Sequence, residues 1–92
     1  MINYFWNADK NRKLVAERNI SFEEIILHIK DGHVLNIVEN KNYPGQKFYV
    51  IDIENYVYLV PFILKENEGI FLKTIIPSRK ATKQYLGGKW NV

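Results

Sequence analysis

The sequence of 92 residues contains no cysteine, and this absence removes several kinds of chemistry. Without thiols the chain cannot form disulfides, thiolate zinc sites or cysteine nucleophiles. It has only two histidines, His28 and His33. A zinc site built from these two and Asp31 is conceivable, but we expect His28 on the flank of a helix and His33 in the turn after it. We therefore predict neither a metal site nor a cofactor.

Long apolar runs and glycine-rich loops are also lacking. No segment approaches the length needed to cross a membrane, and no apolar signal segment follows Met1. The GGK sequence at Gly87 is too short for either nucleotide-binding fingerprint. We expect a cytoplasmic protein without membrane contact, folded as one domain over residues 1–92, since this length can bury a modest core.

The charges are unevenly distributed, although the formal net charge is only +3. Residues 1–20 carry four cations and two anions, residues 21–70 carry four cations and eight anions, and residues 71–92 carry five cations and no anion. Two basic ends around an acidic middle predict a phosphate-binding patch, provided that the ends meet in space. The alternative is that these lysines and arginines are solvated and only aid solubility.

Residues 1–33 are predicted to form two helices. Asn7 can cap the first, over residues 8–18. Ser21 and Glu24 form a capping-box pattern at the start of the second, and Gly32 can end it. Between these ends Phe22, Ile25, Ile26 and Ile29 form one apolar stripe, as in a helix that faces a core.

Residues 34–77 change to the pattern of strands. The segments VLNIVE, KFYVIDIE, YVYLVPFI and IFLKTII are short and rich in β-branched and aromatic residues. The turns between them are too short for parallel crossovers, so we predict a four-stranded antiparallel meander. Pro61 indicates either an irregularity within the third strand or a position whose backbone nitrogen points away from a partner strand. Both faces of that strand are apolar, so either helices cover both faces of the sheet or a partner protein or second copy covers part of one.

Ser78 can start a short C-terminal helix over residues 78–88, which Gly87 and Gly88 would end, leaving residues 89–92 as a loose tail. The predicted order is two helices, four strands and one helix. Such an order in a single unit is typical of an α+β domain.

RNA cleavage is one reaction that needs neither metal nor cysteine. A ribose 2′-hydroxyl attacks the adjacent phosphate while the protein positions the groups, moves protons and neutralises developing charge. Arg79 follows a predicted strand at a helix N-terminus, which also attracts phosphate. Lys10 and Arg12 lie in the first predicted helix, and Tyr85 could stack on a base. The same basic residues equally describe an RNA-binding module without catalysis.

Two segments resemble a known family. YFWNADKNRKLVAERNISFEE resembles the opening of BrnT-type toxins, ribonuclease-like toxins of bacterial type II toxin–antitoxin systems, and IIPSRKATKQY resembles their Ile-Ile-Ser-Ala-Arg-x-Ala-Thr element. The element order is also that of the family, which is related to the RelE-like ribonuclease toxins. The matching positions are Trp6, Lys10, Ser21, Phe22, Glu23, Glu24, Arg79, Ala81 and Thr82. Three places depart from the family pattern: Asn7 replaces an acid, Glu17-Arg18 replaces Lys-His, and Tyr85 stands where an acid often follows Ala-Thr.

The resemblance implies an endoribonuclease toxin that cleaves mRNA, free or ribosome-associated, and so inhibits translation until an antitoxin neutralises it. It carries Lys10 and Arg79 over as catalytic residues. The other candidates for RNA binding are Arg12, Arg18, Lys80, Lys83 and Tyr85. Arg18 replaces the family histidine but is a poor general base, because a guanidinium stays protonated. The expected partners are RNA, a cognate antitoxin and a second copy of the chain; the alternative function is a non-catalytic RNA- or protein-binding domain on the same fold.

Overall fold

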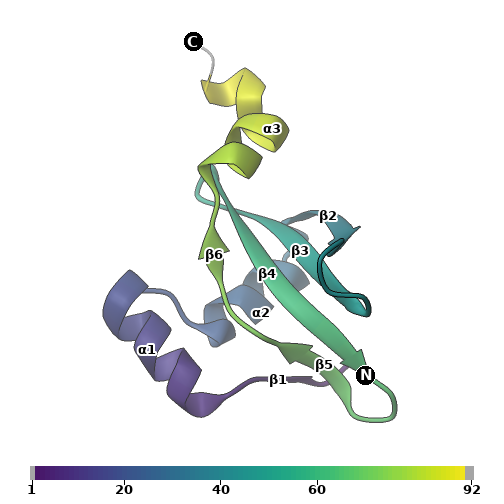
Figure 1. The fold of residues 1–92 in the computed structure, drawn as a ribbon. Helices are drawn as coiled ribbons and strands as arrows, with labels where there is room; N and C mark the ends of the chain where they lie inside the picture. Colours follow the sequence, from purple (N-terminus) through teal and green to yellow (C-terminus); the bar gives the residue numbers. More distant parts are fainter. Residues whose placement is uncertain (1, 91–92) are drawn as a thin grey trace.

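The two N-terminal helices begin at the capping residues that the sequence predicts. Figure 1 shows the computed structural model, which describes residues 2–90. Helix α1 spans Ala8–Arg18, and the Asn7 side chain accepts a hydrogen bond from the backbone N–H of Lys10 at 2.9 Å. Helix α2 spans Phe22–Lys30 and begins with the capping box of Ser21 and Glu24. Gly32, with φ +83°, follows its end as expected of a left-handed C-terminal residue.

The predicted meander forms the centre of the sheet but is not the whole sheet. Strands β2 (Val34–Glu39), β3 (Gln46–Ile53), β4 (Tyr56–Lys65) and β5 (Gly69–Leu72) lie side by side and antiparallel in chain order. Strand β1 (Tyr4–Phe5) pairs parallel with β5, and β6 (Ile76–Pro77) pairs antiparallel with β4. The fold is therefore α+β with a mixed, six-stranded sheet, and the prediction of four purely antiparallel strands is corrected.

The segment IFLKTII was predicted as one strand, and the structure divides it into β5 and β6. Pro61 of β4 lies beside the break, and its carbonyl accepts a hydrogen bond from the Lys73 N–H at 2.8 Å. A proline has no N–H to donate in return, so a regular ladder cannot continue past it. Pairing with β4 resumes where Ile76 lies opposite Leu59.

Helices cover both faces of the sheet. On one face, α1 and α2 enclose the larger core, which includes Leu14, Phe22, Ile25, Tyr49, Ile51, Val60, Phe62 and Leu72. On the other face, α3 (Arg79–Trp90) packs a smaller core of Val50, Val57, Ala81 and Leu86. Figure 1 shows α3 at the end of the sheet where β3 turns into β4, away from α1 and β1. Coverage of the second face is therefore local.

Helix α3 is interrupted directly before its two glycines and then resumes. It is kinked at Leu86, where φ is −119° and ψ is 18°, and it continues to Trp90. Gly87 lacks the positive φ that characterises a helix-ending glycine. A glycine within a helix costs only about 1 kcal/mol relative to alanine, so it need not end the helix. Of the predicted loose tail, residues 89–90 are helical and residues 91–92 lie outside the described part of the chain. Across residues 2–90, no helix is long and apolar enough to cross a membrane.

Candidate nucleic-acid interface

The Ala-Thr pair of the segment SRKAT fixes α3 on the sheet. Thr82 is 2% exposed, and its hydroxyl accepts a hydrogen bond from the Val57 N–H at 2.8 Å. The same hydroxyl donates to the Ser78 carbonyl at 2.7 Å. The Ser78 side chain in turn accepts a hydrogen bond from the Ala81 N–H at 3.0 Å, so Ser78 caps α3 as the sequence predicts. Thr82 and Ala81 therefore have structural roles.

The cations of α3 occupy the helix face opposite these anchors. Arg79, Lys80 and Lys83 are all exposed. Arg79 and Lys83 are four residues apart and lie on one flank of the helix, while Lys80 lies towards the other. Together with the unbonded N–H groups of the first turn, these side chains make α3 an anion-attracting surface. We call Arg79, Lys80 and Lys83 the α3 basic face.

Arg18 lies next to the chain that leads into β6 and α3. Its Nη1 donates a hydrogen bond to the carbonyl of Ile75 at 2.7 Å, although the two residues are 57 positions apart. The end of α1 is therefore tied to the segment that precedes β6 by one residue and α3 by four. A guanidinium has five N–H donors, so this bond leaves others for a phosphate.

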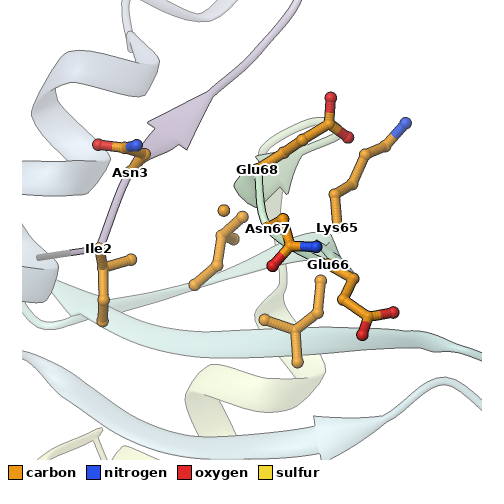
Figure 2. Close-up of a pocket in the computed structure, with 9 residues that line it drawn as sticks. Ile2, Asn3, Lys65, Glu66, Asn67 and Glu68 are labelled. Carbon is orange, nitrogen blue, oxygen red and sulfur yellow. The ribbon is translucent and has the colours of Figure 1, made fainter.

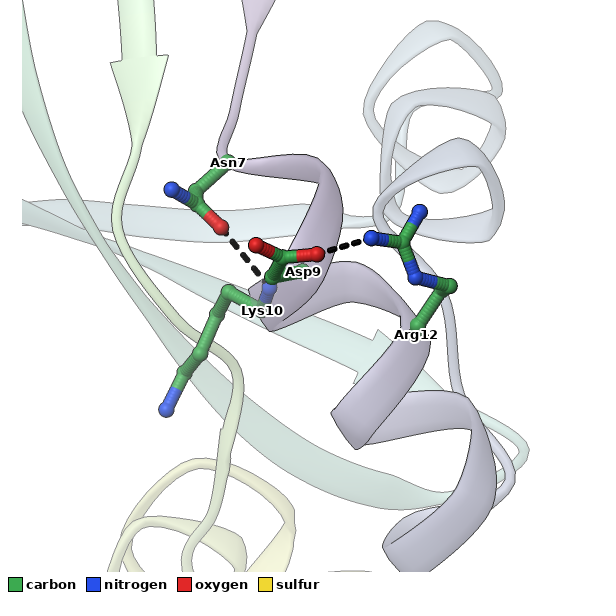
Figure 3. A network of polar contacts seen from close by, with 4 residues as sticks. All are labelled: Asn7, Asp9, Lys10 and Arg12. Atoms are coloured by element: carbon green, nitrogen blue, oxygen red, sulfur yellow. Dashed lines mark hydrogen bonds and ion pairs between the residues drawn. The ribbon is translucent and has the colours of Figure 1, made fainter.

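Lys10 and Arg12 lie in the first turns of α1 (Figure 3). Arg12 forms an ion pair with Asp9, and both side chains are largely exposed. This contact neutralises part of the charge that Arg12 would offer to RNA. The ammonium of Lys10 points away from that ion pair, and only its backbone N–H is held by Asn7.

The starts of α1 and α3 lie in different parts of the fold. Figure 1 shows α1 beginning beside β1 and α3 beginning beyond β6. The end of α1 meets the C-terminal basic segment through the bond from Arg18 to the Ile75 carbonyl. A phosphate site shared by Lys10 and Arg79 stays a prediction.

Tyr85 is held in the packing between α3 and the sheet. Its ring packs against the smaller core, and its hydroxyl accepts a hydrogen bond from the Asn36 side chain of β2 at 3.0 Å. No local sequence signal points to Asn36, because the contact joins residues 49 positions apart. A groove beside Tyr85 is lined by Lys80 and Gln84 of α3 and by side chains of β2, β3 and β4.

A second groove lies at the other end of the molecule (Figure 2). It is formed by Ile2, Asn3 and the turn that joins β4 to β5, and it measures about 600 Å³. Two carboxylates, Glu66 and Glu68, border it, while Lys65 lies over the Phe71 ring, 5.7 Å from its centroid. These acids disfavour phosphate, so this groove does not belong to the candidate RNA interface.

Three side chains that could transfer protons, those of His28, His33 and Tyr49, interact with other side chains of the fold. His28 and His33 face each other with their Nδ1 atoms 2.7 Å apart. Burial, together with a side-chain hydrogen bond with Tyr4, raises the pKa of Tyr49, so this phenol stays protonated at neutral pH. Among residues 2–90, no three His, Asp or Glu side chains gather as a metal site.

Comparison of the sequence with protein-family models and with curated proteins finds no match.

Proposed function

We propose that this protein binds RNA through the α3 basic face and acts as an endoribonuclease toxin of a type II toxin–antitoxin system. The observation that carries the proposal is the anchoring of α3. Thr82 and Ala81 are buried against β4, and this leaves Arg79, Lys80 and Lys83 directed to solvent. The motif that resembles the toxin family thus divides into residues that dock the helix and residues free to bind phosphate.

Arg79 is the residue to which we assign charge stabilisation at the scissile phosphate. It begins α3 directly after the Ser78 cap, at the helix end whose first backbone N–H groups attract anions. A guanidinium can hold two phosphate oxygens at once, as the developing phosphorane charge requires. Arg18 contributes a second cation, because its hydrogen bond to the Ile75 carbonyl holds it beside the start of β6, the strand that leads to Arg79.

The experiment is single-turnover cleavage of RNA measured beside equilibrium RNA binding. Arg79→Ala should lower the cleavage rate by roughly 10²–10³, the usual cost of one such contact, and lower RNA affinity far less. Arg79→Lys should restore little, because an ammonium lacks the bidentate fork. The matched control is Lys83→Ala on the same flank of α3, which should weaken binding by about one phosphate contact and leave the chemistry largely unchanged.

Two results would contradict the enzyme proposal. One is an equal loss of binding and cleavage in Arg79→Ala. The other is an absence of cleavage by the unaltered protein, including in the presence of ribosomes. If the unaltered protein still binds RNA, either result would favour the alternative, a non-catalytic RNA-binding domain. Co-expression with the product of the neighbouring gene tests the toxin assignment separately, since a cognate antitoxin should relieve growth arrest.

A further inference from the structure

The groove beside the α3 basic face has an apolar floor and a polar rim. Its volume is about 290 Å³, slightly below the range of sites for drug-sized ligands. Such a space suits one small ring system. Val50 is buried, and Val38, Phe48 and Leu59 are half-buried, while Lys80 and Gln84 are exposed at the rim. An entering planar group would meet apolar side chains below and polar ones at its edge.

The helix register sets which cation faces this groove. Lys80 and Gln84 are four residues apart on α3, so they lie on the same flank, and both line the groove. Lys83, on the other flank, does not line it. On β2, Val38 faces α3. Glu39 of β2 also lines the groove, so the charged residues around it are one acid, Glu39, and one cation, Lys80.

The groove is held open by contacts on the opposite wall. The Tyr85 hydroxyl accepts a hydrogen bond from Asn36 of β2, and the Thr82 hydroxyl accepts one from Val57 of β4. These two bonds fix α3 against strands on either side of β3. Bonds within the chain thus fix the groove walls, so binding requires little rearrangement.

A nucleobase has the properties that this site matches. It is planar, its two faces are apolar, and its edge carries hydrogen-bond donors and acceptors. Proteins commonly hold unstacked bases of single-stranded RNA against aromatic side chains, as Phe48 could do here. The Gln84 amide offers one acceptor and two donors to a base edge, and Lys80 offers a cation to the attached phosphate. Residues 71–92 contain no acid that would repel the phosphate chain.

We infer that this groove binds one unstacked base of single-stranded RNA, with Lys80 on the attached phosphate and Gln84 on the base edge. The inference rests on the proposed RNA binding and adds a base-binding subsite to it. The exposed side chains of α3 then bind RNA in two ways. Arg79 and Lys83 follow the phosphate chain on one flank, while Lys80 and Gln84 hold a base on the other.

The test compares adenosine 5′-monophosphate with ribose 5-phosphate, which has the same sugar and phosphate but no base. Binding is followed by NMR shifts of the Val50 and Leu59 methyl groups. The nucleotide should shift these methyl groups and bind roughly tenfold more tightly than ribose 5-phosphate, in line with the value of stacking one base on an aromatic ring. Neither compound can be cleaved by attack on an internucleotide phosphate, so catalysis does not interfere.

Matched variants separate the groove from general charge. Lys80→Ala and Gln84→Ala should weaken nucleotide binding, whereas Lys13→Ala, with the same loss of charge at an exposed position of α1, should not. Phe48→Leu should lower the affinity for the nucleotide and leave the affinity for ribose 5-phosphate unchanged. All four variants should keep the unaltered protein's pattern of backbone NMR signals outside the groove. Those at positions 80 and 84 are exposed and test the inference even if Phe48→Leu disturbs folding.

Other outcomes overturn the inference. Equal binding of the nucleotide and ribose 5-phosphate, or equal losses in Lys80→Ala and Lys13→Ala, would show phosphate binding without a base site. Methyl shifts caused by N-acetylphenylalanine amide and not by the nucleotide would assign the groove to an apolar side chain of a protein partner. Long single-stranded RNA that binds without shifting these methyl groups would leave the proposed RNA binding intact and remove only the base site.

Discussion

The backbone N–H of Val57 donates a hydrogen bond of 2.8 Å to the buried hydroxyl of Thr82, although the two residues are 25 positions apart in the chain. This bond satisfies a strand N–H that would otherwise be buried beneath α3 without a partner. It also fixes the position of the helix that carries Arg79, Lys80 and Lys83. The stability of the fold and the presentation of the α3 basic face are therefore linked through one side chain.

Replacement of Thr82 by valine should lower the free energy of unfolding by about 1–3 kcal/mol. Valine has nearly the same shape but leaves the Val57 N–H buried and unpaired, which is the more costly outcome of losing a hydrogen bond. Urea unfolding measures the change. Thr74→Val, the same substitution in the connection between β5 and β6, is the control and should change stability by less than about 0.5 kcal/mol. Equal effects at both positions would contradict the role of this bond.

Gly69→Ala should destabilise the protein more than Gly45→Ala. Both glycines have positive φ, +122° and +86°, so alanine introduces backbone strain at either position. At Gly69 the added Cβ would also collide with the carbonyl of Asn3, whereas at Gly45 it would meet nothing within 4 Å. The extra cost at Gly69 should be about 1–3 kcal/mol, as for overpacking.

Unfolding curves for the two glycine variants provide the measurement. Amide exchange should in addition accelerate at Ile70, whose N–H donates to the Asn3 carbonyl at 2.8 Å. That local effect is expected in Gly69→Ala and not in Gly45→Ala. Equal stabilities of the two variants would show that β1 moves aside without cost.

Stability should fall at alkaline pH because of Tyr49. Burial, and secondly the hydrogen bond with Tyr4, raise its pKa in the folded state above the ordinary value of 10.0. The unfolded state then loses its proton first as the pH rises, so the stabilisation is complete below about pH 10 and decreases above it. Tyr49→Phe should flatten this alkaline slope. Tyr43→Phe, at an exposed tyrosine, is the control and should retain it.

Arg18→Ala should affect both stability and RNA binding. The variant loses the hydrogen bond to the Ile75 carbonyl, with an expected cost of about 0.5–1.5 kcal/mol in urea unfolding. RNA affinity should fall, with a salt dependence weaker by about one phosphate contact. Arg12→Ala is the control: its ion pair with Asp9 is exposed, so the effect on stability should stay below about 0.5 kcal/mol. Unchanged RNA binding in Arg18→Ala would remove this residue from the interface.

Much of the fold follows from local sequence signals. Asn7 and Ser21 start their helices because a polar side chain at a helix N-terminus satisfies free backbone N–H groups, whatever the rest of the chain does. The strands of the meander follow because the turns between them are too short for any other arrangement. The turn at Glu54 and Asn55, both with positive φ, has the same local origin.

The added strands β1 and β6 could not be predicted in this way. Each has two residues, and each exists only because a distant strand offers hydrogen-bonding groups at its edge. At Gly87 the sequence marked the place where the helix is interrupted, since Leu86 is non-helical, but not the helical residues that follow. Local propensity does not contain that information.

The same distinction holds for the candidate site. By itself the sequence determined that cations gather near both ends of the chain, that thiol chemistry is excluded, and that Arg79 begins a helix directly after Ser78. Only the tertiary structure decided which of these cations share a surface. It placed Arg18 at Ile75 and formed the groove between Lys80 and Phe48. The physical reason is that charges are set residue by residue, whereas their proximity depends on the packing of both helical layers on the sheet.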